Sequence, residues 1–384
     1  MENLFNPHNN LWLQNKYSYY KILRERSSLY WSDKYTLYPI TRYSDVVFAL
    51  NTPEIFASTN GNLIREFPSR IGKTLATNDE PKHSELKALI KEGYSKDNVE
   101  RVMHSVVEYT SSILSNNKVI DFSELSLKIT SWLSLEILNI PYNKHHIHSL
   151  LLGMLKNSDK SISSEFYTTN DNDLLALNKI LNELILSKTP ATGPGVYAEY
   201  IKNCDLYKHG LFFFTAAIFP GGTSTAGALQ FLLYDLAHNV EARQAVINDP
   251  KLARNAVAES LRYNTATSRF LRTVKQPVEI QNTLIPAETR VAVCLDSANR
   301  DPEHWDTPDV FDIYRNNSKS ISFGHGMHTC IAQVITREVL ISVLNLFLSK
   351  FPDYTIIPDS SEFEYLMTAP GNFDFVTNLQ IIRP

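Results

Sequence analysis

The chain is poor in cysteine and has no long apolar run. Its 384 residues include three cysteines, Cys204, Cys294 and Cys330, without the spacing of a disulfide framework. So few thiols suit a reducing compartment, and we expect a cytoplasmic protein. The longest apolar run, residues 211–219, is far shorter than the ~20 residues that a membrane span requires. The N-terminal residues include neither a basic nor an apolar segment, so we expect no signal peptide and no membrane anchor.

The charge is nearly balanced and the chain lacks obvious linkers. A formal net charge of −4 gives no indication of a nucleic-acid or anionic-membrane partner. There is no Pro/Ser-rich hinge, low-complexity tract or internal repeat, and the polar residues 158–173 fit a surface loop between helices. Although length alone favours two or three domains, we expect one large helix-rich domain over residues 1–384.

The most informative segment is residues 323–332, F-G-H-G-M-H-T-C-I-A, around Cys330. Gly324 and Gly326 permit backbone turns that residues with a Cβ resist. Residues 332–351 then have apolar side chains at helical spacing, which places Cys330 just before a helix N-terminus. The helix dipole and the unpaired N–H groups at such an end favour a thiolate, the form of cysteine that binds metals.

Local pattern alone leaves other interpretations of this segment open. A lone cysteine is most often a small buried hydrophobe. His325, His328 and Cys330 could also form part of a zinc cluster, although no Cys-x-x-Cys or His-Glu-x-x-His partner exists elsewhere in the chain. At this level, metal–thiolate ligation and a structural thiol are equally supported.

The rest of the chain resembles the cytochrome P450 family. The segment matches that family's haem-binding pattern, Phe-x-x-Gly-x-His-x-Cys-x-Gly, at Phe323, Gly326, His328 and Cys330, with Ala332 replacing the last glycine. Further similar segments follow the family's order at residues 40–46, 56–58, 259–262, 298–302 and 308–315. The resemblance implies a mainly α cytochrome P450 fold with a small β region. It also implies haem b, with the Cys330 thiolate as axial ligand and Phe323 and Gly324 beside it.

Glu259 and Arg262 match the family's Glu-x-x-Arg pair within a predicted helix over residues 252–263. Their spacing places both side chains on one helix face, where an exposed ion pair contributes only ~0.2–0.5 kcal/mol. The resemblance instead implies a buried pair that braces the loop of Cys330. Breaking a buried pair costs roughly 3–5 kcal/mol, so we expect a Glu259→Ala protein to lack haem.

Four residues are predicted to hold the haem propionates: Arg272, His328, His83 and Lys87. Arg272 lies in the extended segment 268–274, and the arginine fork suits a carboxylate. Period-two alternation places Ser268 and Phe270 on the same face, nearer the substrate.

His83 and Lys87 come from residues 79–87, which resemble the family's Pro-x-His-x-x-x-Arg helix. Lysine at the arginine position keeps the charge but loses the fork, and a solvated charged face is an equally good interpretation of Lys87.

Residues 206–238 are predicted to form one long helix, kinked at F-P-G-G-T-S-T-A (219–226), because apolar periodicity continues on both sides. A helix break in a loop is the alternative. In the family this kink forms a groove for dioxygen and carries Gly-x-Asp/Glu-Thr-Thr.

This chain has no acid at the family's Asp/Glu position. Counting back from Glu259 places Thr223 at the family's acid position and Ser224 and Thr225 at its two alcohol positions. A register shifted by one residue places Ser224 at the acid position and Thr225 at the alcohol position. Hydroxyls pass protons but do not supply them near neutral pH, so we expect a relay through water, help from a substrate group, or an atypical reaction.

Two loops resemble substrate-facing parts of the family: residues 60–70 and residues 368–373. Arg65 and Phe373 in these loops, and Arg269 outside them, are candidate substrate contacts. Because most such residues are structural, we expect surface charge for the arginines and a core position for the aromatic ring.

These features predict a haem-thiolate monooxygenase that oxidises a small natural-product-type molecule with O2. The 384 residues leave no room for a reductase domain, so we expect a separate ferredoxin or flavodoxin to dock near four cations: Lys82, Lys87, Lys91 and Arg337. One alternative is a haem-thiolate enzyme of another reaction, such as oxidative coupling, nitration, desaturation, dehydration or peroxide-driven oxidation. A second is a haem-binding or carrier-docking protein with little turnover.

Overall fold

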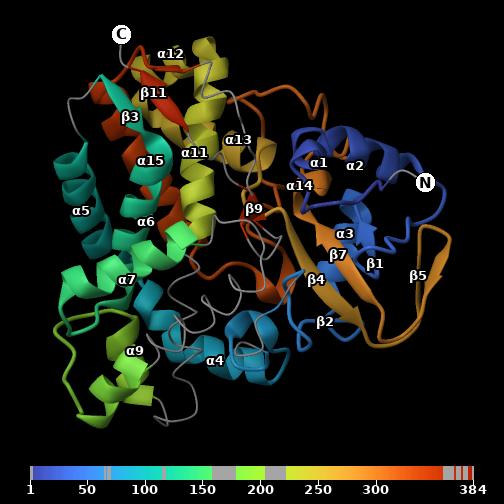
Figure 1. The fold of residues 1–384 in the computed structure, drawn as a ribbon, viewed down its shortest axis with the longest axis horizontal. Helices are drawn as coiled ribbons and strands as arrows, with labels where there is room; N and C mark the ends of the chain where they lie inside the picture. The colour runs from blue at the N-terminus through green and yellow to red at the C-terminus, as the bar shows by residue number, and fades with distance from the viewer. Residues whose placement is uncertain are drawn as a thin grey trace.

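The computed structural model describes residues 3–64, 66, 71–114, 118–157, 179–203, 222–357, 367–368, 373–374 and 379–382. Within them, helices predominate and the strands form small sheets, so the expected mainly α fold with a small β region is confirmed (Figure 1). No helix among the described residues is long and apolar enough to cross a membrane.

The α-helices are α1 (Asn10–Gln14), α2 (Lys16–Glu25), α3 (Tyr43–Asn51), α4 (Lys82–Ile90), α5 (Lys96–Ile113), α6 (Phe122–Leu138), α7 (Lys144–Asn157), α9 (Val196–Asn203), α11 (Thr223–His238), α12 (Val240–Asn248), α13 (Ala253–Tyr263), α14 (Leu295–Ala298) and α15 (Gln333–Lys350). Short 3-10 turns are η1 (Leu75–Thr77), η2 (Lys91–Tyr94), η3 (Pro250–Leu252) and η4 (Gly326–His328).

The main hydrophobic core forms where α5, α6, α11, α13 and α15 pack together. The central helix α15 buries Ile335, Val339 and Leu340 and, one and two turns further on, Val343 and Phe347. Each such side chain contributes roughly 1.5–3 kcal/mol when fully buried. This packing holds α15 in place, and Cys330 lies just before the N-terminal end of that helix.

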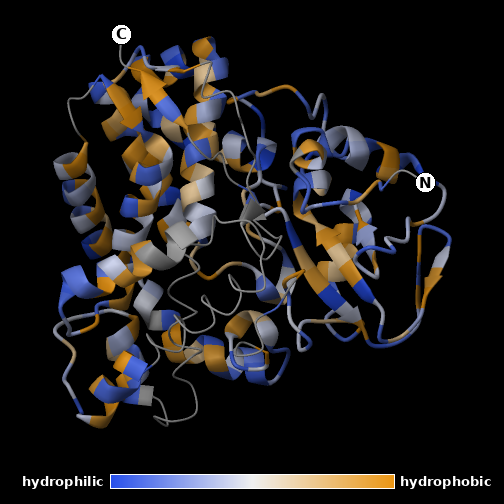
Figure 2. Ribbon diagram, in the orientation of Figure 1, coloured by the Kyte–Doolittle hydropathy of each residue, from blue (hydrophilic) through white to orange (hydrophobic). Residues whose placement is uncertain are grey.

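The largest sheet has four strands in the order β1-β7-β4-β2. Its strands are β1 (Leu37–Ile40), β2 (Phe56–Ala57), β4 (Arg269–Val274) and β7 (Arg290–Cys294). β7 pairs in parallel with β1 and antiparallel with β4. The sheet lies on the N-terminal side of the molecule beside α1, α2 and α14, and apolar residues are concentrated on its strands (Figure 2).

Three smaller sheets complete the described β structure. They comprise β3 (Val119–Asp121), β8 (Thr355–Ile356) and β11 (Gln380–Ile382); β5 (Val278–Ile280) and β6 (Thr283–Ile285); and β9 (Met367–Thr368) and β10 (Phe373–Asp374). The last pair is antiparallel, with Phe373 opposite Thr368.

The predicted elements around Cys330 agree closely with the structure. The helix expected over 332–351 is α15, the one over 252–263 is η3 followed by α13, and the extended segment is β4. Of the helix expected over 206–238, the structure describes α11, from Thr223 onward. The first part of that prediction, the loop at 158–173 and Arg65 lie outside the described residues.

Candidate functional site

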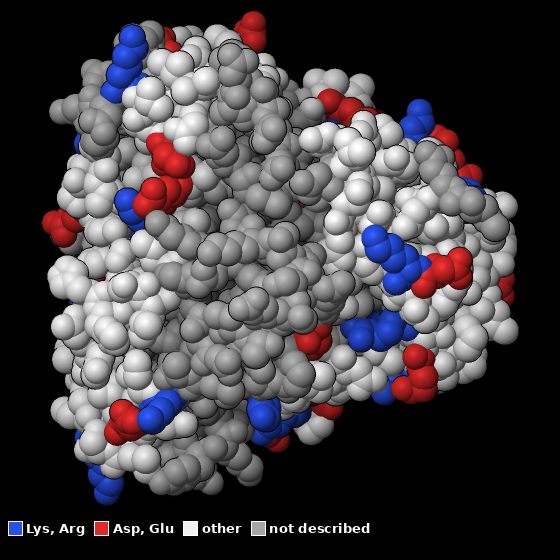
Figure 3. All heavy atoms as spheres, in the orientation of Figure 1, with Lys and Arg blue, Asp and Glu red and all other residues white. Residues whose placement is uncertain are grey.

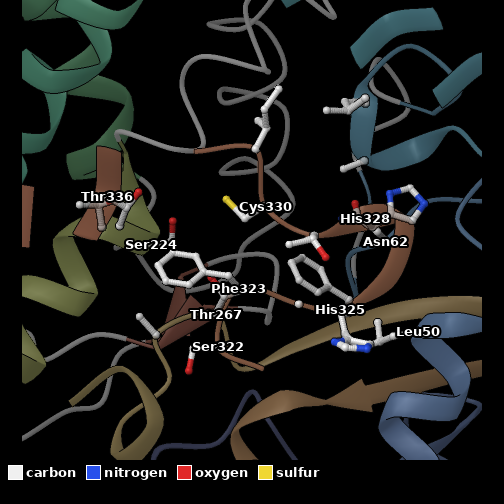
Figure 4. Close-up of a pocket in the computed structure, with 18 of the residues that line it drawn as sticks. Leu50, Asn62, Ser224, Thr267, Ser322, Phe323, His325, His328, Cys330 and Thr336 are labelled. Atoms are coloured by element: carbon white, nitrogen blue, oxygen red, sulfur yellow. The ribbon is translucent and has the colours of Figure 1, made fainter. Parts of the chain in front are cut away.

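A cavity lies between the helices and the four-stranded sheet, with Cys330 on its wall. The space not filled by atoms is about 1380 Å³ and includes a part open to solvent. The wall is built from η1, α4, the first turn of α11, β4 and the loop before α15. Figure 4 shows Ser224, Phe323 and Cys330 around one part of this space, with His328 further along the loop.

The loop before α15 is tightly folded around Cys330. The Cys330 amide donates to the carbonyl of Phe323 at 2.9 Å, which closes the loop. Gly326 has a φ of +68°, and a Cβ there would lie 2.6 Å from the carbonyl oxygen of Leu50 in α3. Only glycine satisfies both constraints, so this residue allows the loop to sit against α3.

The electrostatics of Cys330 depend on more than its helix. Burial raises the pKa of the Cys330 thiol, while a hydrogen bond from the Ala332 amide and the charges of Arg337 and Lys87 lower it, and burial prevails. The sequence-based expectation that the helix end would by itself favour a thiolate was therefore incomplete, because it ignored desolvation. A bound metal cation would supply the missing positive charge, since a coordinating thiol is deprotonated outright.

Arg272 lies in β4, lines the cavity and is 4% exposed. Its Nη1 donates to the neighbouring Leu271 carbonyl at 2.8 Å, and no carboxylate within the described residues forms an ion pair with it. Burial lowers the pKa of Arg272 to about 10, and nearby Asp79 offsets part of this effect. A buried guanidinium with several spare donors fits an anionic ligand group.

His83 and His328 line the same part of the cavity, with ring centroids 4.5 Å apart. Burial lowers the pKa of His328 to about 4 and also lowers the pKa of His83. His83 Nδ1 is buried without a hydrogen-bond partner, and the Glu80 carboxylate lies 3.6 Å away. Both rings are therefore neutral near pH 7.

Asp79 is a site residue to which the sequence analysis assigned no specific role. Its carboxylate accepts the Ser58 amide at 2.9 Å and lies 3.4 Å from His328 Nε2. Burial would raise the pKa of Asp79, but hydrogen bonds from His328 and Ser58 hold it below its ordinary value. Asp79 thus orients the His328 ring from behind the cavity wall. The partners are 249 positions apart, so no local pattern indicated the contact.

The strand residues are arranged only partly as predicted. Phe270 and Arg272 share the cavity face of β4, whereas Ser268 is fully buried and is absent from the cavity wall. Because β4 begins at Arg269, the period-two alternation does not extend back to Ser268; Ala266 and Thr267 line the wall instead. Lys87 is half-buried near Cys330 and His83 and does not line the cavity.

Arg269 corrects another expectation. Predicted as a surface charge, it is fully buried and forms ion pairs with Asp296 and Asp374 at 3.4 and 3.2 Å. Those partners come from the start of α14 and from β10. Phe373 precedes Asp374 in β10.

The hydroxyl residues begin α11, whose N-cap is Gly222. Ser224 and Thr225 line the cavity, whereas Thr223 does not. No Asp or Glu among the described residues lines the cavity. Both counting schemes therefore bring hydroxyl groups, and no carboxyl group, to this part of the wall.

Glu259 and Arg262 form a fully buried bidentate ion pair, with N–O distances of 2.7 and 2.9 Å. Arg262 also donates to the carbonyls of Asn299 and Pro308, each at 2.9 Å. The side chain of Asn299 in turn bonds the Ile321 amide and Ser322, just before the loop of Cys330. The pair thus connects α13 to that loop through the segment between them.

A zinc cluster receives no support in the described part of the chain. No group of three or more His, Cys, Asp or Glu side chains there is arranged to hold a metal ion. His325 is exposed. A metal bound by Cys330 would therefore take its other ligands from outside the described side chains.

The cytochrome P450 family model matches residues 146–375, which is more than half of the chain, and the chain belongs to this family. It is 24% identical to cytochrome P450 CYP199A2 of Rhodopseudomonas palustris over 343 residues, covering 84% of this chain and 82% of that one. It is 23% identical to pulcherriminic acid synthase of Bacillus subtilis over 386 residues, covering 93% of each.

Solved structures agree on the fold. P450BioI, in complex with an acyl carrier protein ligated to hexadec-9Z-enoic acid, superposes with a TM-score of 0.86 at 20% identity, covering 97% of this chain and all of that one. Ligand-free cytochrome P450 TbtJ1 has a TM-score of 0.84 at 20% identity, covering 96% and 97%.

Family membership makes the protein a haem-thiolate oxidoreductase of the monooxygenase type, with haem b as its cofactor. Members of this kind act on small molecules with a redox partner. The cavity fits that group, because Cys330, His83 and Arg272, which has no ion-pair partner among the described residues, line one space.

Proposed function

We propose that the protein oxygenates a small natural-product-type molecule in the cavity, with Cys330 as the axial ligand of haem b. The observation that carries this proposal is that Cys330 lines a cavity that is also lined by the first turn of α11. Bound haem with a thiolate ligand supplies the oxygen-activating chemistry. The protein's residues bind the haem and the substrate, orient them and limit the access of water.

In this proposal the haem propionates lie against Arg272, His83 and His328. Arg272 would supply the positive charge and a fork of donors, and the neutral His83 ring would supply one N–H donor. The single N–H of neutral His328 is engaged by Asp79, so His328 would shape this part of the site without donating to a propionate. Asp79 holds His328 in place through its Nε2. Phe323 and Gly324, which line the cavity beside Cys330, would contact the haem, and Lys87 would contribute a longer-range charge.

Ser224 and Thr225 are proposed to guide protons into the cavity. Both are on its wall at the start of α11, and hydroxyl groups both donate and accept hydrogen bonds. Because no carboxyl group among the described residues lines the wall, these residues would pass protons from water. This arrangement serves ordinary oxygenation, and nothing in the described site favours an atypical reaction.

The electron donor is proposed to be a separate ferredoxin or flavodoxin that docks beside Cys330. Arg337 is exposed in α15 and lies near Cys330, and Lys91 is exposed at the start of η2. Lys82 is partly neutralised by Glu85 at 3.2 Å, so we assign it a smaller part. Many other cations have an acidic neighbour, as on the face in Figure 3. A cytoplasmic location suits a thiolate enzyme with a soluble donor.

Reversing the charges of Arg337 and Lys91 to glutamate should slow reduction by such a donor roughly tenfold or more at low salt, because charged surfaces steer association. Lys96→Glu, on the 87% exposed side chain at the start of α5, is the control and should leave the rate unchanged. If the charge-reversed protein and the Lys96→Glu control were reduced at equal rates, this docking face would be refuted.

The oxygenase assignment is tested by turnover. The purified protein is screened for molecules that shift the ferric Soret band toward the high-spin form, and each hit is incubated with a surrogate ferredoxin system and isotopically labelled O2. We expect at least one product that carries the label. Hits that are never oxygenated, despite measured reduction of the haem, would contradict the proposal.

A further inference from the structure

A group of four buried charged side chains lies beside the cavity wall: Lys16, Arg269, Asp296 and Asp374. We call it the charge cluster. None of the four is more than 2% exposed. Two cations and two anions give a net charge of zero, which is the condition under which charged groups are tolerated in a protein interior.

Asp374 is held from two directions. Arg269 Nη2 donates to both of its carboxylate oxygens at 3.2 Å, and Lys16 Nζ donates to Oδ2. Burial alone would raise the pKa of Asp374, but Arg269 and Lys16 hold it below its ordinary value. Asp296 Oδ2 accepts hydrogen bonds from the same two cations, from Lys16 Nζ at 3.1 Å and from Arg269 Nη2 at 3.4 Å. Asp374 is therefore ionised, and the two carboxylates share both cations.

Asp374 also fastens its strand to the cavity wall through the backbone. Its amide donates to the Ala266 carbonyl at 2.8 Å, and Ala266 and Thr267 line the cavity. β10 packs against α11, which carries Ser224 at its first turn. One residue thus fixes the β9–β10 ladder (Met367–Thr368 with Phe373–Asp374) next to two walls of the site.

Stability alone is a poor explanation for this cluster. Well-packed apolar residues in place of a buried ion-pair network are often neutral or stabilising. What such a network does provide is one defined arrangement, because its donors and acceptors are satisfied in one geometry only. Here the arrangement joins α2, β4, α14 and β10 at the edge of the cavity.

We propose that Asp374 is a positioning residue for the substrate: the charge cluster holds the β9–β10 ladder against Ala266 and Thr267 and thereby fixes the cavity wall that the substrate contacts. This inference rests on the proposed function, in which that cavity binds haem and substrate. Ligands that extend away from the iron should depend on Asp374, whereas a ligand confined to the iron should not.

The chain offers a matched pair of variants, Asp374→Asn and Asp296→Asn. Each removes one carboxylate from the same two cations at nearly equal burial, but only Asp374 belongs to the ladder. The first readout is hydrogen–deuterium exchange of a peptide that contains residues 367–374. The second is spectral titration of the ferric protein with imidazole and with the larger 4-phenylimidazole.

For Asp374→Asn we expect faster exchange in that peptide and roughly tenfold weaker binding of 4-phenylimidazole, within the ~10²-fold that a misplacement of about 1 Å can cause. Binding of imidazole should not change. Asp296→Asn should leave both readouts at the parent values, although its thermal stability should fall as well. Equal effects of the two substitutions, or no effect of Asp374→Asn, would overturn the proposal.

A second variant keeps the test decisive if Asp374→Asn does not fold. Lys16→Met/Asp374→Asn removes one charge of each sign and leaves the Arg269–Asp296 pair, so it should recover stability while exchange in the ladder stays fast. Parent-like exchange in this folded variant would also refute the role of Asp374. Hydrogen–deuterium exchange of the ladder requires no haem, so the role of Asp374 can be measured in a protein without haem. Failure of the parent protein to bind haem would contradict the proposed function alone.

Discussion

Replacing Glu259 with alanine should cost a large fraction of the protein's stability and most of its haem. Glu259 and Arg262 are both completely buried and pair at 2.7 and 2.9 Å. Glu259 Oε1 also accepts the Asp312 amide at 2.9 Å and Arg315 Nε at 3.3 Å. The substitution therefore removes the anion that serves two arginines and the acceptor of a backbone amide.

The size of the effect follows from these contacts. Breaking a buried ion pair costs roughly 3–5 kcal/mol. The loss of the hydrogen bond that the Asp312 amide donates to Glu259 adds about 1 kcal/mol. The total of about 4–6 kcal/mol is comparable to the ~5–15 kcal/mol by which domains are stable. Because Arg262 bonds the Asn299 and Pro308 carbonyls, the loss should loosen the segment that leads to Cys330.

The assay combines urea unfolding with the ratio of haem to protein after purification. Glu338→Ala is the matched control, since Glu338 pairs with Arg254 at 3.2 Å on a partly exposed surface. Such a pair contributes at most ~1 kcal/mol, so the control should keep its haem and nearly all of its stability. A Glu259→Ala protein with parent-like haem content and a loss similar to that of the control would refute this reasoning.

Two further predictions concern the site and its surroundings. Arg272→Met should accelerate haem transfer to a scavenging apoprotein by roughly tenfold to a hundredfold, because charged hydrogen bonds contribute ~1.5–3 kcal/mol; an unchanged rate would remove Arg272 from the propionate site. Asp235, buried in α11 beside Ser260 and Asn264, has its pKa raised by burial to about 7, above the ~3.9 of an unfolded chain. The folded protein then binds the extra proton, so stability should fall as pH rises from 4 to 7, by about 4 kcal/mol at most. Asp235→Asn should abolish that slope in chemical denaturation, and an unaltered slope would assign it to other groups.

The sequence was most informative where a feature depends on neighbouring residues. The glycine-bounded loop, the apolar period of α15 and the alternation of Phe270 and Arg272 are local, and each appears in the structure as expected. Ser268 departed from the expectation because it lies one residue before the strand that imposes the alternation. The family resemblance supplied the cofactor, and the family match confirms it.

Features set by distant contacts could not be predicted. Arg269 resembled a surface charge because its partner Asp374 lies 105 positions away, and Lys16 meets the same residue over 358 positions. The pKa of Cys330 depends on burial by side chains from several elements, which no helix-end argument contains. Asp79 was visible as part of a motif, but its contact with His328 requires the folded loop.

The central claim, that Cys330 is the axial ligand, is tested most directly by the spectrum of the reduced protein with carbon monoxide. The parent protein should show the red-shifted Soret band of a thiolate-ligated haem. Cys330→Ser should lose that band, whereas Cys294→Ala, which removes a buried thiol from β7, should retain it. A Cys330→Ser protein with the parent band, or a parent protein without it, would contradict the assignment of the site.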